Sequence, residues 1–220
     1  MAFMSRSYWD ARYSQDPQPF DWYQRYSACE SLRTIAAERL NKEGRTLIVG
    51  CGSSRLAEEL LADGYKALCN ADWCPTVITQ LEERFRRLGV KGVDNKLIDV
   101  RAMGAFADGS YDAVFDKATL DTILSSENGA ESVERMLSEI SRVLKSGGTY
   151  LLLSNAPPAE RLMLLDKPAF GWVCTSQSTI AKPVTALASK ASGHSNHFVY
   201  VMSRRTEKEA KEVAKEEAKE

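Results

Sequence analysis

Short apolar runs alternate along this chain with longer segments in which apolar side chains recur every three or four positions. In the first such unit, residues 46–49 form an apolar run, Gly50-Cys51-Gly52 follows, and leucines then recur at helical spacing until about Asp63. Short runs without polar interruption are typical of strands buried in a parallel sheet. The pattern therefore predicts a strand, a glycine turn and a helix.

The alternation continues to about residue 203 and predicts one α/β domain at residues 27–205. It favours a Rossmann-like, doubly wound sheet of seven strands. We expect the remaining strands at residues 66–72, 96–100, 111–116, 150–153, 170–176 and 197–203. We expect helices at residues 27–40, 56–63, 75–88, 133–144 and 160–165, with a short helix beginning at Thr119.

Local signals add detail to this outline. Ser27 followed by Glu30 predicts a capping box, and Thr119 is expected to cap the short helix. Residues 179–196, rich in Ser, Ala and Lys, are expected to form a mobile loop. The charged tail at residues 206–220 is expected to be a solvated helix or disordered.

Three consecutive predicted strands end in residues that suit an adenosine-containing ligand. The first ends in Gly50-Cys51-Gly52, where backbone N–H groups and a helix start lie at the sheet edge. The second ends in Asp72, the usual position of an acceptor for ribose hydroxyls, and the third ends in Asp99. The dinucleotide fingerprint fails because its third glycine would fall on Arg55. The residues favour an adenosyl ligand without a pyrophosphate and disfavour a nicotinamide dehydrogenase.

Within the N-terminal segment of residues 1–26, residues 8–26 carry seven aromatic side chains whose spacing matches neither a strand face nor a helical stripe. Pro17 and Pro19 interrupt the segment. Two interpretations are open. The rings either plug an edge of the sheet, or they form a lid whose faces attract a sulfonium or an ammonium group.

These motifs together resemble the class I S-adenosylmethionine-dependent methyltransferases. The resemblance rests on Val-Gly-Cys-Gly-Ser-Ser at residues 49–54, Asp72-Trp73, Asp99-Val100 and residues 111–121. It extends from about Tyr8 to about Ser203. The aromatic motifs Tyr-Trp-Asp-Ala-Arg-Tyr and Phe-Asp-Trp-Tyr of the N-terminal segment narrow it to one branch. That branch contains methyltransferase-like proteins and the methyltransferase module associated with endothelin-converting enzyme.

The resemblance implies the class I methyltransferase fold, with S-adenosylmethionine as cofactor and S-adenosylhomocysteine as product. It also implies a protein partner, because known activities in this branch methylate lysine in translation elongation factor one-alpha. It favours the lid interpretation of residues 1–26. Ala118 stands where many relatives carry glycine, and Trp73 stands where many carry tyrosine.

The expected site follows from the strand ends and the resemblance together. The expected cofactor-binding residues are Trp9, Tyr13, Trp22, Gly50, Cys51, Gly52, Asp72, Trp73, Asp99, Val100 and Lys117. The expected substrate-pocket residues are Tyr8, Asp21, Tyr23, Tyr26, Asp116 and Asp121. The proton acceptor for a lysine nucleophile is left open among Asp21, Asp116 and Asp121, so no catalytic residue is assigned.

Composition narrows the choice of partners. The 29 Lys and Arg residues nearly balance the 30 Asp and Glu residues, so no basic excess indicates nucleic acid. Five cysteines without paired spacing favour free thiols in a reducing compartment over zinc or disulfides, and no metal site is expected. The chain shows no signal peptide and no apolar span of ~20 residues. We therefore expect a cytoplasmic protein without membrane contact, and a monomer.

Two other functions remain open at this point. One is methylation of a small molecule on nitrogen or oxygen, and the other is a non-catalytic scaffold that binds S-adenosylmethionine. Methylation of nucleic-acid bases is disfavoured, because the Asn/Asp-Pro-Pro-Tyr/Phe motif frequent in such enzymes is replaced here by Asp116-Lys117-Ala118-Thr119.

Overall fold

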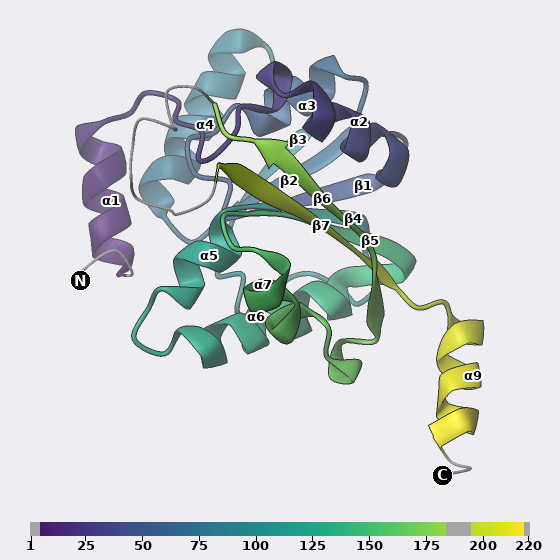
Figure 1. The fold of residues 1–220 in the computed structure, drawn as a ribbon. Helices are drawn as coiled ribbons and strands as arrows, with labels where there is room; N and C mark the ends of the chain where they lie inside the picture. The colour runs from purple at the N-terminus through teal and green to yellow at the C-terminus, as the bar shows by residue number, and fades with distance from the viewer. Residues whose placement is uncertain (1–4, 184–194, 218–220) are drawn as a thin grey trace.

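The computed structural model describes residues 5–183 and 195–217, which form a single seven-stranded sheet with helices on both faces (Figure 1). The strands are β1 (Arg45–Val49), β2 (Ala67–Asp72), β3 (Val93–Leu97), β4 (Tyr111–Lys117), β5 (Leu144–Ser154), β6 (Trp172–Ala181) and β7 (Asn196–Arg204). Their order in the sheet is β3-β2-β1-β4-β5-β7-β6. Strands β1 to β5 run parallel, and β7 runs antiparallel to both of its neighbours. The expected doubly wound sheet is confirmed.

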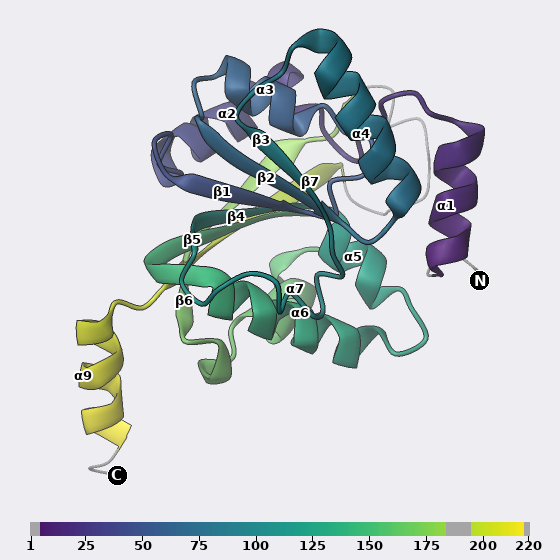
Figure 2. The ribbon, with the colours of Figure 1, turned by 180° about the vertical axis from the view of Figure 1, so that it is seen from behind.

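Two layers of helices bury the sheet (Figure 1 and Figure 2). One face is covered by α2 (Glu30–Arg39), α3 (Leu56–Ala62) and α4 (Pro75–Leu88), and the other by α5 (Thr119–Leu124), α6 (Gly129–Val143) and α7 (Pro158–Leu165). Two short 3-10 helices are η1 (Tyr26–Ala28) and η2 (Pro168–Phe170). Helix α6 packs on the sheet through one apolar face. Its side chains on that face, Val133, Met136, Leu137 and Ile140, are fully buried.

The connections of the sheet reverse direction between β1 and β4. From β1 the chain proceeds through α3 to β2 on one side, whereas β4 lies on the other side of β1 and leads on to β5. In doubly wound sheets a crevice opens at the carboxyl ends of the strands at this switch point, and ligands bind there. The fold therefore places any ligand beside Val49, Asp72 and Lys117.

The N-terminal segment contains a helix that the sequence did not predict, α1 (Arg6–Gln15). The Ser5 hydroxyl caps it by accepting a hydrogen bond from the Tyr8 N–H at 3.1 Å. Asp10 then fastens the helix to the start of α4, where it accepts hydrogen bonds from Cys74 and Thr76. No apolar stripe marked this helix, because its rings pack against several different partners rather than one flat face.

Two predicted caps do not form, because the side chains bind more distant partners. The Ser27 hydroxyl donates to Glu59 at 2.7 Å instead of capping α2. The Thr119 hydroxyl donates to the carbonyl of Val49 at 2.9 Å, and Ala118 occupies the N-cap position of α5. The Thr119 bond joins the ends of β4 and β1.

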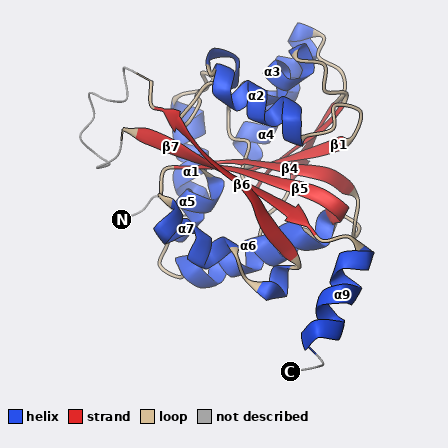
Figure 3. Cartoon of the chain, turned by 45° about the vertical axis from the view of Figure 1, so that its right-hand side comes forward, coloured by secondary structure: helices blue, strands red, loops and turns tan. Residues whose placement is uncertain are grey.

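The structure also differs from the prediction at the edge strand β3 and between β6 and β7. The predicted third strand lies too late, because β3 is a half-exposed edge strand without an apolar run, and residues 98–100 follow it. Part of the expected loop at residues 179–196 is strand, since β6 ends at Ala181 and β7 begins at Asn196; residues 184–194 lie outside the described residues. The tail forms α9 (Glu207–Glu217), which projects from the body (Figure 3). In the described part of the chain, no helix has the length and apolarity needed to cross a membrane.

The turn after β1 leads to a stability prediction. Gly50 has a φ of +57°, and a Cβ there would lie 2.2 Å from the Thr119 hydroxyl oxygen, whereas Gly89 has a φ of +66° with open space around it. Gly89→Ala should cost about 1–2 kcal/mol of unfolding free energy from backbone strain alone. Gly50→Ala should cost about 1–3 kcal/mol more, because the core must also absorb a methyl group. Urea unfolding of both variants measures the difference, and equal losses would contradict the steric role of Thr119.

Candidate functional site

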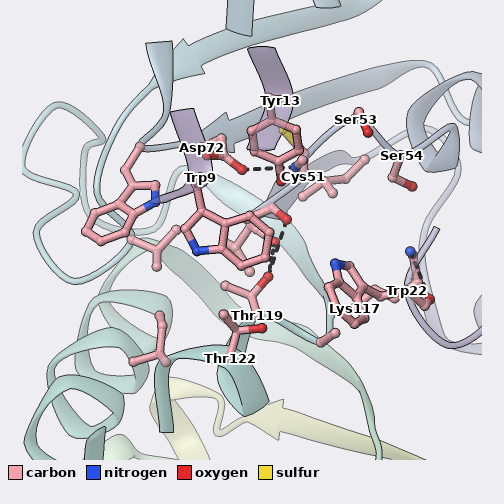
Figure 4. Close-up of a pocket in the computed structure, with 18 of the residues that line it drawn as sticks. Trp9, Tyr13, Trp22, Cys51, Ser53, Ser54, Asp72, Lys117, Thr119 and Thr122 are labelled. Carbon is pink, nitrogen blue, oxygen red and sulfur yellow. Dashed lines mark hydrogen bonds between the residues drawn. The ribbon is translucent and has the colours of Figure 1, made fainter. Parts of the chain in front are cut away.

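A cavity opens at the carboxyl ends of β1, β2 and β4, underneath residues 5–26, which we call the arm (Figure 4). All eleven residues that the sequence associates with a cofactor line this first cavity. They are Trp9, Tyr13, Trp22, Gly50, Cys51, Gly52, Asp72, Trp73, Asp99, Val100 and Lys117. Residues from the arm and from four strand ends therefore meet in one place.

The glycine turn brings backbone close to the cavity floor. Gly52 has a φ of +51°, and a Cβ there would lie 2.7 Å from the Tyr13 hydroxyl oxygen, so the missing side chain lets the arm approach the turn. The Gly52 N–H donates to Asp72 Oδ2 at 2.9 Å. The turn thus connects β1, β2 and the arm.

Asp72 is suited to accept hydrogen bonds from a ligand. Its oxygens accept from the N–H groups of Gly52 and Cys74, and about two of the roughly four lone-pair sites of a carboxylate then remain for hydroxyl donors. Burial raises the pKa of Asp72 to about 6, although the backbone N–H groups oppose this shift. The group is therefore ionised at neutral pH and titrates only slightly below it.

Aromatic and aliphatic side chains form part of the wall beyond Asp72. Trp73, Ile98 and Val100 contribute to it. Arg101 lies over the Trp73 ring at 5.0 Å and forms a bidentate pair with Asp99, in which Nη2 and Oδ2 are 2.8 Å apart. This end of the cavity offers the surfaces that a purine base requires.

A buried ion pair fastens the arm to β4 at the other end of the cavity. Lys117 Nζ lies 3.0 Å from Asp21 Oδ1 and donates to the Trp22 carbonyl at 3.2 Å. Burial lowers the pKa of Lys117, and the negative charge of Asp21 opposes that shift. For Asp21, burial acts to raise the pKa, and Lys117 together with the Ser54 hydroxyl brings it below its usual value. The short distance between the two groups makes the pair a direct link between the arm and β4.

Aromatic rings of the arm form the roof of the cavity. Trp9 stacks on Tyr13 with 5.7 Å between the ring centroids, and Trp22 meets both Trp9 and Phe20 edge to face. Trp22 stays 41% exposed and Phe20 44% exposed, so the roof reaches the surface. Such rings can hold a cationic ligand by their faces.

A second cavity adjoins the first. Trp22, Ala118 and Thr122 line both of them. The second cavity is otherwise lined by Tyr23, Asp121, Leu124, Ser125, Asn155, Ala156, Pro157, Glu160 and Arg161. Two ligands could therefore meet at the Trp22 side chain, one from each cavity.

Asp121 lies in the wall of the second cavity with its hydrogen-bonding capacity filled. Its oxygens accept from the Tyr23 hydroxyl at 2.7 Å and from Arg161 Nη2 at 2.7 Å. They also accept from the Ser154 hydroxyl at 2.7 Å and the Asn155 N–H at 2.8 Å. Four donors occupy about all the lone-pair sites of a carboxylate. Asp121 therefore positions Tyr23, Ser154 and Arg161 around the second cavity.

Four residues expected in the substrate pocket line neither cavity. Asp21 instead pairs with Lys117, as described above. Tyr8 packs edge to face on Trp9 outside the roof. Tyr26, the first residue of η1, is buried, and its hydroxyl donates to Asp63. Asp116 is fully buried and accepts from the Tyr150 hydroxyl, and burial raises its pKa to about 7.

The sequence missed several residues of the two cavities, Arg12 and Phe20 in the first and Thr122, Asn155 and Arg161 in the second. Arg12 could have been found, because it stands inside the aromatic motif of the arm. The start of α7 after Pro157 was a visible signal for Arg161, since a helix beginning at the strand edge projects its first turn there.

Comparisons with known proteins agree with this geometry. Residues 47–152 match the description of a methyltransferase domain. The EEF1A lysine methyltransferase 4 of Mus musculus is 32% identical over 175 residues, which are 75% of this chain and 66% of that protein. The eEF1A lysine and N-terminal methyltransferase of Danio rerio is 32% identical over 77% of this chain. The chain spans just under two thirds of the first relative and 24% of the second.

Solved structures share the fold at lower identity. A SAM-dependent methyltransferase from Methanosarcina mazei is 18% identical, with a TM-score of 0.64 over 86% of this chain and all of that one. The [4+2]-cyclase SpnF is 17% identical, with a TM-score of 0.64 over 80% of this chain and 81% of that one. Because a cyclase uses the same fold, the fold alone does not fix the reaction.

The buried pair between the arm and β4 leads to a second prediction. Asp21→Asn leaves the Lys117 ammonium buried without its counter-charge, a change that costs about 3–5 kcal/mol at buried pairs. The arm should then detach more often, and trypsin should cleave it faster at Arg12 or Arg25. Asp16→Asn is the matched control, since this exposed arm carboxylate accepts only from the Gln18 N–H. Equal cleavage rates in the two variants would rule out the pair as the anchor.

Proposed function

We propose that this chain belongs to the class I S-adenosylmethionine-dependent methyltransferases, in the branch of the eEF1A lysine methyltransferases, and that it methylates a lysine of elongation factor eEF1A. One observation carries the proposal: the first cavity suits the cofactor, and a second, separate cavity meets it at Trp22, Ala118 and Thr122. The names of the relatives support the choice of substrate.

The residues of the first cavity would hold the cofactor in one orientation. Trp73 and Val100 would pack along the adenine, and Asp72 would accept hydrogen bonds from the ribose hydroxyls. Lys117 and Trp22 would face the methionine part, where aromatic faces attract a sulfonium. The transferable methyl group would then be held near Trp22, Ala118 and Thr122, which line both cavities.

The acceptor lysine would enter through the second cavity. In the transfer, the lone pair of the amine bonds to the methyl carbon while the carbon–sulfur bond breaks, and the sulfonium becomes a neutral thioether. The amine must first lose a proton, because a lysine has a pKa of about 10.4 in water. Removing water from around it, between Trp22 and Tyr23, favours the neutral amine.

Tyr23 is the polar group placed to meet the incoming ammonium. Burial raises the pKa of Tyr23 above its ordinary value, and Asp121 nearby acts in the same direction, so the phenol stays protonated. Because its proton is donated to Asp121, the oxygen of Tyr23 can accept a hydrogen bond from the ammonium. Water in the second cavity then takes the proton. The residues thus orient and desolvate the amine, which is where much of the rate enhancement in such transfers arises.

The proposal includes a cytoplasmic monomer that acts on protein, without binding nucleic acid or membrane. All five cysteines are free thiols, which is consistent with a reducing compartment. The arm acts as a lid over the cofactor, and the charged tail that begins at residue 206 takes no part in the site.

The central prediction is methyl transfer to eEF1A. Purified protein incubated with labelled S-adenosylmethionine and eEF1A should place label on a lysine, as located by mass spectrometry. eEF1A whose lysines are chemically blocked beforehand should receive no label. Label appearing only in small molecules of a cell extract would replace the proposal with a small-molecule methyltransferase. Cofactor binding without any transfer would leave a scaffold.

Asp72 should make cofactor binding depend on pH. Ribose hydroxyls donate to the carboxylate, so binding favours its ionised form, and affinity falls as the pH drops through about 6. Between pH 7 and pH 5 the ionised fraction falls about tenfold, and the dissociation constant of S-adenosylhomocysteine should rise by up to that factor. Asp72→Asn should bind more weakly and lose this dependence. Calorimetry tests both points, and an equal pH slope in the variant would remove Asp72 from the ribose contact.

A further inference from the structure

The charges around the first cavity leave one cation without a carboxylate partner. Three cationic side chains line the cavity, namely Arg12, Arg101 and Lys117. Arg101 is paired with Asp99, and Lys117 with Asp21. Among the residues that the structure describes, no carboxylate forms an ion pair with Arg12. Asp16, one helical turn later, accepts a hydrogen bond from the Gln18 N–H instead.

Aromatic rings hold the Arg12 guanidinium in place. Its central carbon lies 6.0 Å from the ring centroid of Trp9, 5.3 Å from that of Phe20 and 5.9 Å from that of Trp22. Ring faces stabilise the charge without using the five N–H donors. The guanidinium is therefore positioned while its hydrogen-bonding edge stays available to a ligand.

The rings also locate Arg12 at one end of the cavity. The Phe20 N–H donates to the Ser53 hydroxyl at 3.1 Å, and the Trp22 carbonyl accepts from Lys117. These contacts place the rings beside the glycine turn and the end of β4. Asp72 and Trp73 lie instead at the carboxyl end of β2. Arg12 therefore faces the part of the ligand that lies away from the base.

We propose that Arg12 binds the carboxylate of the methionine part of the cofactor. The cofactor offers a carboxylate at the end opposite its adenine, and a guanidinium matches a carboxylate with two parallel hydrogen bonds. The inference rests on the proposed function only for the orientation of the cofactor and not for the identity of the methyl acceptor. Cofactor binding would also hold the arm in place, because Arg12 belongs to α1 in the arm, whereas the cavity floor belongs to the sheet.

The test compares two ligands that differ only in the carboxylate. S-adenosylhomocysteine carries it, and decarboxylated S-adenosylhomocysteine keeps the ammonium, thioether and adenosine. Calorimetry with the full-length protein should show the wild type favouring S-adenosylhomocysteine by tenfold or more. Arg12→Gln should weaken S-adenosylhomocysteine binding by at least tenfold and change binding of the decarboxylated ligand by less than twofold. Arg12→Lys, which keeps the charge, should show an intermediate loss.

The control is Arg6→Gln, because Arg6 is exposed on the same helix and lines neither cavity. It should leave both affinities unchanged. Equal weakening of both ligands by Arg12→Gln would show that Arg12 only packs the rings, and no weakening of either would remove it from the site; both results overturn the proposal. Wild-type protein that does not distinguish the ligands overturns it as well. Failure to methylate eEF1A, with the ligand preference intact, would overturn the proposed substrate and leave the role of Arg12 supported.

Discussion

The hydrogen bond from the Thr119 hydroxyl to the carbonyl of Val49 holds the end of β1 against the start of α5, beside the first cavity. β1 and β4 are neighbours there, and the connections leave them in opposite directions. The Thr119 side chain fills the space that a Cβ on Gly50 would need, so the turn after β1 and the start of α5 form one packed unit. Next to this unit, the Gly52 N–H donates to Asp72, and Lys117 forms its ion pair with Asp21 of the arm. Both cavities depend on that geometry.

Local signals were sufficient to predict the frame of the molecule and the floor of the first cavity. Apolar runs and glycines report backbone preferences, and parallel strands bring their ends to one edge, so Gly50, Asp72 and Lys117 could be brought together from the sequence. The direction of a side chain depends on distant partners instead. Tyr26 turns inward to Asp63 for this reason, and Ser27 leaves its helix for Glu59. Of the second cavity, Tyr23 and Asp121 were among the predicted substrate-pocket residues, whereas Asn155 follows β5 without a motif that marks it.

Backbone strain is concentrated where the two cavities meet. Among the described residues, Tyr23 and Ala118 are the non-glycine residues with positive φ, at 62° and 74°. Such a conformation costs about 1–2 kcal/mol for an L-residue, so glycine would adopt it at the position of Ala118 with less strain. Here the methyl group of Ala118 stands at the border between cofactor and acceptor. The strained Tyr23 turn presents its phenol to the second cavity, so the strain lies next to the transfer site.

The shared wall of the two cavities has a kinetic consequence. Trp22 lines both, and Tyr23, the next residue of the arm, lines the second. With the cofactor bound beneath the arm as proposed, its exchange would require the arm to move, and that movement would also remove one wall of the second cavity. The acceptor lysine would then dissociate from the second cavity each time S-adenosylhomocysteine is exchanged for S-adenosylmethionine. An arrangement of this kind favours a distributive course, in which a lysine receiving several methyl groups dissociates and rebinds between them.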